Sequence, residues 1–255
     1  MRRIPVAFPT VLTGRRGTDV QNRKPIALLV PTRARPHNAR KLIDAWWSAT
    51  EGKSTLYFMV DSDDPEILSY QDIAITVDNA DVVVMIGRPA RLVEWTNFMA
   101  EHLWQRTGHK IFGSIGDDHL PESSGWESAI IEAVEAMPNK AGVVYGDDGV
   151  HGGNLATAFF MTANITDALG YMCPPELEHL YCDNAAMDIG RASTLIYLPD
   201  VKITHYHPIA GKAEWDDTYV RGNEGRVQHH DSLAYSKWKA EELPQLPGWL
   251  STIVV

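Results

Sequence analysis

The sequence predicts an α/β fold in which a mostly parallel central sheet is flanked by helices. Short apolar runs typical of buried strands alternate along the first half with amphipathic stretches typical of helices. Strand, helix, strand, helix in this order implies parallel strands with covering helices. At 255 residues and 44% hydrophobic content, the chain is large enough for the core of one sizeable domain.

The first half contains the clearest elements. Residues 26–30 form a continuous apolar run that ends at Pro31, the pattern of a strand buried on both faces. Further strands are expected over 55–60, 82–86 and 110–116. Apolar residues at helical spacing predict helices over 39–49 and 91–106, and a third around 126–137.

The second half is less regular. Residues 141–145 and 155–162 read as strands, and we interpret the Gly- and Asp-rich loop between them as a hairpin connection. A helix is expected over 176–188 and a strand over 194–198. His205, His207 and a polar tail follow.

Charge and composition exclude several classes of protein. Residues 1–24 hold six basic side chains against the single acid Asp19, whereas the whole chain has a net charge of −10, so the body is acidic. An acidic body argues against nucleic-acid binding, and the arm is expected to be a poorly ordered terminus. The sequence shows no apolar run long enough to indicate a membrane span or a signal peptide. A cytoplasmic location is therefore expected. Cys173 and Cys182 are expected to be reduced, because two cysteines make neither a disulfide framework nor a zinc site.

Polar side chains follow several predicted strands. In open α/β sheets, ligands bind beyond the carboxyl ends of the strands, so these residues should face one crevice. The chain has neither a GxGxxG fingerprint nor a Walker loop, so any phosphates would be held by a metal ion and arginine. The residues concerned are Pro31, Thr32, Arg33 and Arg35 after the first strand, Asp61 after the second, and Asp117 and Asp118 after the later strand.

The run Asp117-Asp118-His119 is the candidate metal site. Carboxylate oxygens beside an imidazole nitrogen, at the end of a buried strand, suit Mn²⁺ or Mg²⁺. The alternative is an acidic turn without a ligand, because glycine and aspartate are ordinary turn residues. His205 and His207 would point to opposite faces of a strand, so only one of them can face the site.

Taken in order, these motifs resemble a GT-A glycosyltransferase, and most closely the small family-2-like enzymes, including phage-encoded ones. The resemblance covers residues 26–208. It rests on Pro-Thr-Arg-x-Arg-Pro after the first strand, an Asp after the second, Arg91 at the start of a helix, the Asp-Asp pair, a later Asp and a C-terminal His.

The resemblance implies a role for each matching residue. Thr32, Arg33 and Arg35 would lie near the nucleotide, with Asp61 accepting a hydrogen bond from the base and Arg91 near the base or diphosphate. Asp117 would reach the ribose, Asp118 would bind the ion, and His207 would be the distal metal ligand. Asp183 stands where inverting members keep the general base, with helix capping as the alternative. His119 departs from the usual third Asp, so the metal-binding side chains remain open between Asp117, Asp118 and His119.

The chain is expected to have three parts: a basic arm (1–24), a catalytic domain (25–208, nucleotide-binding to about 120 and acceptor-binding after it) and a C-terminal extension (209–255) that packs on the same domain. The expected function is metal-dependent transfer of a sugar from a nucleotide-sugar donor, UDP-linked first and GDP-linked next. The acceptor would carry a hydroxyl on a modified DNA base, a virion protein or a glycan, with DNA disfavoured by the acidic charge. A nucleotidyltransferase and a non-catalytic nucleotide- or carbohydrate-binding module are the alternatives.

Overall fold

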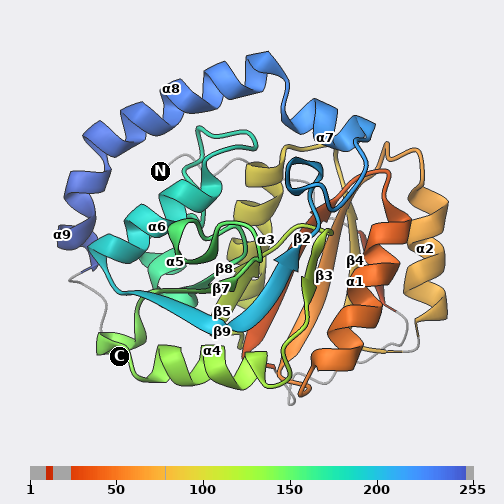
Figure 1. Ribbon diagram of the computed structural model, residues 1–255, viewed down its shortest axis with the longest axis horizontal. Helices are drawn as coiled ribbons and strands as arrows, with labels where there is room; N and C mark the ends of the chain where they lie inside the picture. The colour runs from red at the N-terminus through yellow and green to blue at the C-terminus, as the bar shows by residue number, and fades with distance from the viewer. Residues whose placement is uncertain (1–9, 14–23, 78, 251–255) are drawn as a thin grey trace.

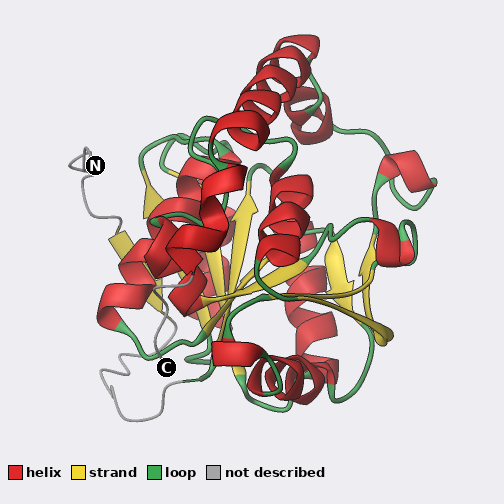
Figure 2. Cartoon of the chain, turned by 90° about the vertical axis from the view of Figure 1, so that its left-hand side faces the viewer, coloured by secondary structure: helices red, strands yellow, loops and turns green. Residues whose placement is uncertain are grey.

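The computed structural model describes residues 10–13, 24–77 and 79–250, and within them nine strands form one curled sheet with helices on both sides (Figures 1 and 2). The strand order is β1-β4-β3-β2-β5-β8-β7-β9-β6. Alternate residues of the buried strand β2 enter two separate hydrophobic clusters, one on each face of the sheet. The α/β fold expected from the sequence is confirmed.

The parallel part of the sheet carries the predicted crevice. It consists of β4 (Val82–Gly87), β3 (Ser54–Asp61), β2 (Ile26–Thr32) and β5 (Ile111–Ser114), all running in one direction. Because they are parallel, their carboxyl ends meet at one edge. Within the N-terminal arm, β1 (Thr10–Thr13) pairs antiparallel with β4, whereas residues 1–9 and 14–23 lie outside the described residues.

The other part of the sheet is mixed. The strand β8 (Phe159–Thr162) is antiparallel to β5 and to β7 (Val143–Asp147), which confirms the predicted hairpin. The strand β9 (Leu195–His205) runs parallel to β7 and is longer than the expected 194–198. The short β6 (His119–Pro121) pairs antiparallel with β9 and places His119 directly opposite His205.

The helices divide between the two faces. Apolar side chains of α1 (Pro36–Ala49), α2 (Ile67–Thr76) and α4 (Trp126–Glu135) enter one cluster. Those of α3 (Leu92–Arg106), α5 (Ala163–Leu169) and α6 (Cys182–Ala192) enter the other. Helix α2 was not predicted, because its apolar Leu68 and Ile75 are exposed and the segment lacks a single apolar face. Short 3₁₀ turns lie at Pro138–Lys140, Gly152–Asn154, Pro208–Ala210 and Leu243–Gln245.

The prediction of a helix over 176–188 is wrong for residues 176–181, nearly half of that range, since α6 begins only at Cys182. The preceding segment is irregular because its backbone is held elsewhere. Asp231, which is fully buried, accepts the backbone N–H groups of Glu178, His179 and Leu180 at 2.7–2.9 Å. These amides therefore bind a carboxylate instead of forming the first turn of a helix.

Asp231 belongs to the C-terminal segment, which consists of α7 (Asp217–Gly222), α8 (Gly225–Glu241) and α9 (Leu246–Leu250). Helix α8 runs along the outside of the molecule past α6 (Figure 1). Trp238 of α8 and Leu246 of α9 are buried in the same cluster as α6. Across the described residues, every helix is too short or too polar to cross a lipid bilayer.

We expect Asp231→Asn to lower the free energy of unfolding by about 1–3 kcal/mol, because an amide group cannot accept all three N–H groups. The hydrogen bonds from His230 and these amides outweigh burial and hold the pKa of Asp231 below its usual range. The stabilisation is therefore present above the ordinary aspartate pKa and is lost as the pH falls through the lowered value. Denaturant unfolding at neutral and acidic pH measures both effects.

The matched control is Asp44→Asn, which alters an exposed carboxylate on α1. Equal stability of the Asp231 and Asp44 variants at neutral pH would contradict the role given to Asp231.

Candidate functional site

A cavity of about 410 Å³ opens beyond the carboxyl ends of β2, β3 and β5. Parallel strands bring these ends together, as the sequence predicted. All candidate site residues line this one cavity: Pro31, Thr32, Arg33, Arg35, Asp61, Arg91, Asp117, Asp118, His119, Asp183, His205 and His207.

Asp61 lies at the end of β3 and is held by three protein groups. Its Oδ1 accepts hydrogen bonds from Trp95 Nε1 at 2.8 Å and from the Ala90 backbone at 3.1 Å, and its Oδ2 accepts one from Arg33 at 2.8 Å. Gly87 makes this arrangement possible, because a Cβ there would lie 2.4 Å from the Trp95 ring. Only Oδ2 of Asp61 keeps room for a further hydrogen bond.

The two arginines after β2 are both engaged by carboxylates. Arg33 pairs with Asp61 and Asp63. Arg35 makes a two-pronged ion pair with Asp216, at 2.7 and 2.5 Å, and lies 3.6 Å above the ring of Tyr219. Arg35 therefore lines the cavity, but its charge is already neutralised by the C-terminal segment.

Asp117 is tied into the protein at the end of β5. Its carboxylate accepts hydrogen bonds from Thr32 at 2.6 Å and Asn38 at 3.3 Å, and Arg35 lies 3.4 Å away. Burial and the charge of Asp118 raise the pKa of Asp117 to about 6, against the opposing effect of Arg35. Because its oxygens are occupied, Asp117 is less suited than Asp118 to bind an ion.

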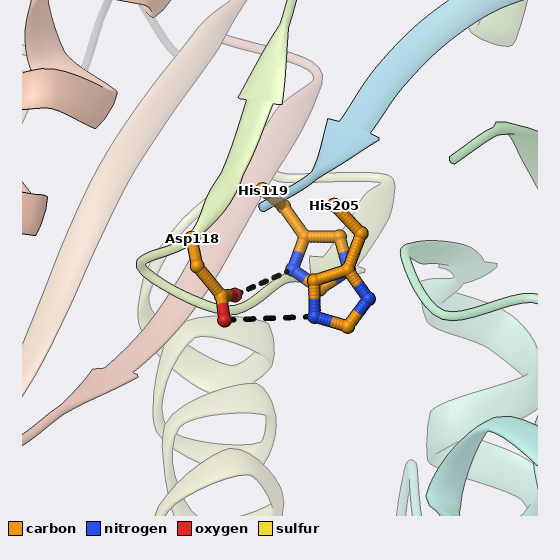
Figure 3. A group of neighbouring side chains, drawn as sticks. All are labelled: Asp118, His119 and His205. Carbon is orange, nitrogen blue, oxygen red and sulfur yellow. Dashed lines mark hydrogen bonds and ion pairs between the residues drawn. The ribbon is translucent and has the colours of Figure 1, made fainter. Parts of the chain in front are cut away.

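Asp118 faces two imidazoles, which lie together on one side of its carboxylate (Figure 3). His119 Nδ1 is 3.1 Å from its Oδ1, and His205 Nε2 is 3.5 Å from its Oδ2. The two rings stack at 3.9 Å because β6 and β9 place them opposite each other. Burial alone would raise the pKa of Asp118, but the two imidazoles outweigh it and hold that pKa well below its usual range.

This trio fits a divalent cation. One ligand atom from each of Asp118, His119 and His205 lies within 4.8 Å of the others. Nε2 of His119 is buried and has no hydrogen-bond partner among the described residues, an unmet requirement that buried polar atoms rarely show. One carboxylate with two imidazoles is a donor set for divalent first-row metal ions, the class that includes Mn²⁺.

From the sequence, His207 is the expected distal metal ligand, whereas the structure places His205 in the cluster with Asp118. Strand β9 ends at His205, so His207 lies beyond it and the alternation of a strand no longer applies. His207 Nδ1 accepts the Ile209 backbone N–H at 3.2 Å, and its ring packs edge-on against Tyr219. Both histidines line the cavity, but His205 is the one that joins Asp118 in the cluster.

The C-terminal segment supplies residues that the sequence analysis missed. Tyr219 donates a hydrogen bond to Asp118 Oδ2 at 2.8 Å, across 101 positions of sequence. Arg221 lines the cavity and has no ion pair within the described part of the chain, unlike Arg33, Arg35 and Arg91. No local spacing could have revealed these partners, because α7 meets the strand ends only in the folded chain.

Asp183, in the first turn of α6, also lines the cavity. The helix cap is Tyr181, so Asp183 is not the N-cap residue. Its carboxylate accepts the Asn184 backbone N–H at 2.8 Å. Burial raises the pKa of Asp183, although that hydrogen bond opposes the shift. His151, from the loop between β7 and β8, lines the same cavity and was also missed.

The sequence matches no protein-family profile and no curated protein. Solved structures do match. The mannosyltransferase PcManGT from Pyrobaculum calidifontis, in complex with GDP-Man and Mn²⁺, superposes with a TM-score of 0.57 at 11% identity, over 99% of this chain and 77% of that one. S. aureus TarS in complex with UDP gives 0.51 at 11% identity, over 88% and 78%. The chain therefore has a GT-A type fold, with a curled central sheet flanked by helices, like that of the matching glycosyltransferase.

Proposed function

We propose that this protein is a metal-dependent glycosyltransferase that moves a sugar from a nucleotide-sugar donor to a hydroxyl of an acceptor. The observation that carries the proposal is the cluster of Asp118, His119 and His205 in the strand-end cavity. The fold supports it, since a structure with GDP-Man and Mn²⁺ shares that fold. A cavity of about 410 Å³ is also in the range of small-molecule sites.

Asp118, His205 and His119 are the residues that would hold Mn²⁺ or Mg²⁺, with His207 beside them. A bound divalent cation would supply electrophilic stabilisation of the charge that develops on the leaving diphosphate. Tyr219 shares Oδ2 of Asp118, so this oxygen would serve the ion and the tyrosine together.

The charges that line the cavity suggest where the donor binds. Arg33 and Arg35 are neutralised by aspartates, and Arg91 lies 3.4 Å from Glu178. Arg221 is the cavity-lining arginine without an ion pair in the described residues, so we assign it to the diphosphate. The nucleoside would lie toward Asp61, whose Oδ2 keeps room for one donor. A UDP-sugar is the first candidate and a GDP-sugar the next.

Asp183 faces the cavity from α6, and we place the acceptor hydroxyl against it. A carboxylate within hydrogen-bond reach assists the loss of the hydroxyl proton during attack on the sugar. The raised pKa of Asp183 fits this use, because it makes the carboxylate a stronger base than an exposed aspartate.

The function is tested by a thermal-shift screen of UDP, GDP, UMP, GMP and the UDP- and GDP-sugars, each with and without Mn²⁺. A ligand that binds only the native state raises the melting temperature by mass action. We expect the melting temperature to rise with the nucleotides of one base only, either uracil or guanine. The rise should require Mn²⁺ and should be larger for the diphosphate than for the monophosphate. Asp118→Ala should lose the dependence on Mn²⁺, and Arg221→Met should lose the preference for the diphosphate.

His229→Ala, at an exposed position of α8, is the control that should behave as the wild type. The absence of any nucleotide-induced shift in the wild type would refute the proposal. Binding of a nucleotide sugar without its breakdown would favour a non-catalytic binding module.

The metal ligands are tested by titrating Mn²⁺ into the protein without nucleotide. Replacing a direct ligand should weaken binding by about 10- to 100-fold or more, since even outer-sphere partners have effects of that size. We expect this loss for Asp118→Ala and His205→Ala and a smaller one for His207→Ala. A loss of Mn²⁺ affinity that is confined to His207→Ala would contradict the assignment of Asp118 and His205 as ligands. It would instead indicate His207 as the metal-binding histidine.

A further inference from the structure

The loop between β7 and β8 is built around one buried carboxylate. Asp148 is 2% exposed. Its Oδ1 accepts the backbone N–H groups of Val150, His151 and Gly152 at 2.8, 2.6 and 3.3 Å. Its Oδ2 accepts hydrogen bonds from the Thr157 hydroxyl and from His151 Nδ1, both at 2.8 Å. A hairpin connection does not require a buried charge with five donors, so this arrangement calls for a reason.

The contacts of Asp148 determine which nitrogen of His151 carries the proton. Three backbone N–H groups and the Thr157 hydroxyl already donate to the Asp148 carboxylate. Asp148 is thus an acceptor, and His151 Nδ1 must be the donor to it. The second nitrogen, Nε2, then carries a free lone pair when the ring is neutral.

That second nitrogen belongs to a side chain in the cavity. His151 lines the same space as Asp118 and Asp183, and 42% of its side chain is exposed. The loop is also fixed relative to the candidate metal cluster, because the His205 backbone N–H donates to the Asp148 carbonyl at 2.9 Å. The imidazole is therefore oriented by a buried carboxylate and lines the cavity that Asp183 also lines.

We propose that His151 is a further catalytic residue of this site, a general base that Asp148 orients. The inference rests on the proposed function and deepens its acceptor side. The acceptor O–H bond breaks and its proton passes to His151 Nε2. The oxygen lone pair forms the bond to the anomeric carbon, and the bond from that carbon to the diphosphate breaks with its electron pair on the leaving oxygen. In this scheme His151 takes the proton in place of Asp183, and the negative charges of Asp148 and Asp183 stabilise the resulting imidazolium.

The proposal accounts for two features that a structural loop leaves unexplained. A histidine held by a buried carboxylate is the arrangement that fixes an imidazole for proton transfer, whatever the fold. The exposed part of His151 also gives the captured proton a direct route to solvent. Asp148 is a positioning residue in this scheme, because it acts through His151.

The test uses the full-length protein with Mn²⁺ and the nucleotide sugar that gives the largest thermal shift. With enzyme in excess, release of the nucleoside diphosphate reports attack by water, so the natural acceptor is not needed. His151→Gln should slow this release about 100-fold or more, the usual effect of general-base catalysis, with donor affinity unchanged. Added imidazole should restore part of the rate to His151→Ala, and His229→Gln should match the wild type.

A second measurement does not depend on activity. In ¹⁵N NMR spectra, the signals lost in His151→Gln identify His151, and we expect its neutral ring to carry the proton on Nδ1. The proposal is overturned if Nε2 carries the proton, if His151→Gln keeps the wild-type rate, or if its lost rate comes with an equal loss of donor affinity. If the wild-type protein binds no nucleotide, the proposed function itself is refuted. The binding data alone distinguish this outcome from a failure of the proposal for His151.

Discussion

The structure of this site follows from placing two adjacent carboxylates at the buried end of one strand. Asp117 and Asp118 are both buried. Burial of two unpaired carboxylates would cost more free energy than the packing of one strand supplies. The protein compensates them differently. Asp117 is satisfied by Thr32, Asn38 and Arg35, whereas Asp118 is met by two imidazoles and one phenol. Only Asp118 is left with partners that a metal ion could replace or share.

This compensation draws in the C-terminal segment. Asp216 neutralises Arg35, Tyr219 reaches Asp118, and Asp231 holds the loop that precedes the helix of Asp183. Each contact links a residue beyond position 208 to a strand end or loop of the central sheet. The segment first expected to be an extension thus contacts residues at the strand ends and the loop that precedes α6.

The sequence predicted best what depends on neighbouring residues. The strands β2, β3 and β4 and the helix α3 are continuous apolar or amphipathic patterns, and the polar residues that follow them must meet at one edge of a parallel sheet. Residues that act through long-range pairing were not predictable in this way. His205 joins Asp118 because β6 pairs with β9, and Arg221 enters the cavity from a helix whose position no local pattern reveals. Asp148 was read as a turn residue, since its burial appears only in the folded chain.

The most direct test of the account is an anomalous difference map from crystals grown with Mn²⁺ and the nucleoside diphosphate selected by binding. We expect one strong manganese peak bonded to the Asp118 carboxylate and at least one imidazole of His119 or His205, with the diphosphate on the same ion. A manganese peak away from Asp118, or a nucleotide bound in the cavity with no metal between its phosphates and Asp118, would contradict the central claim.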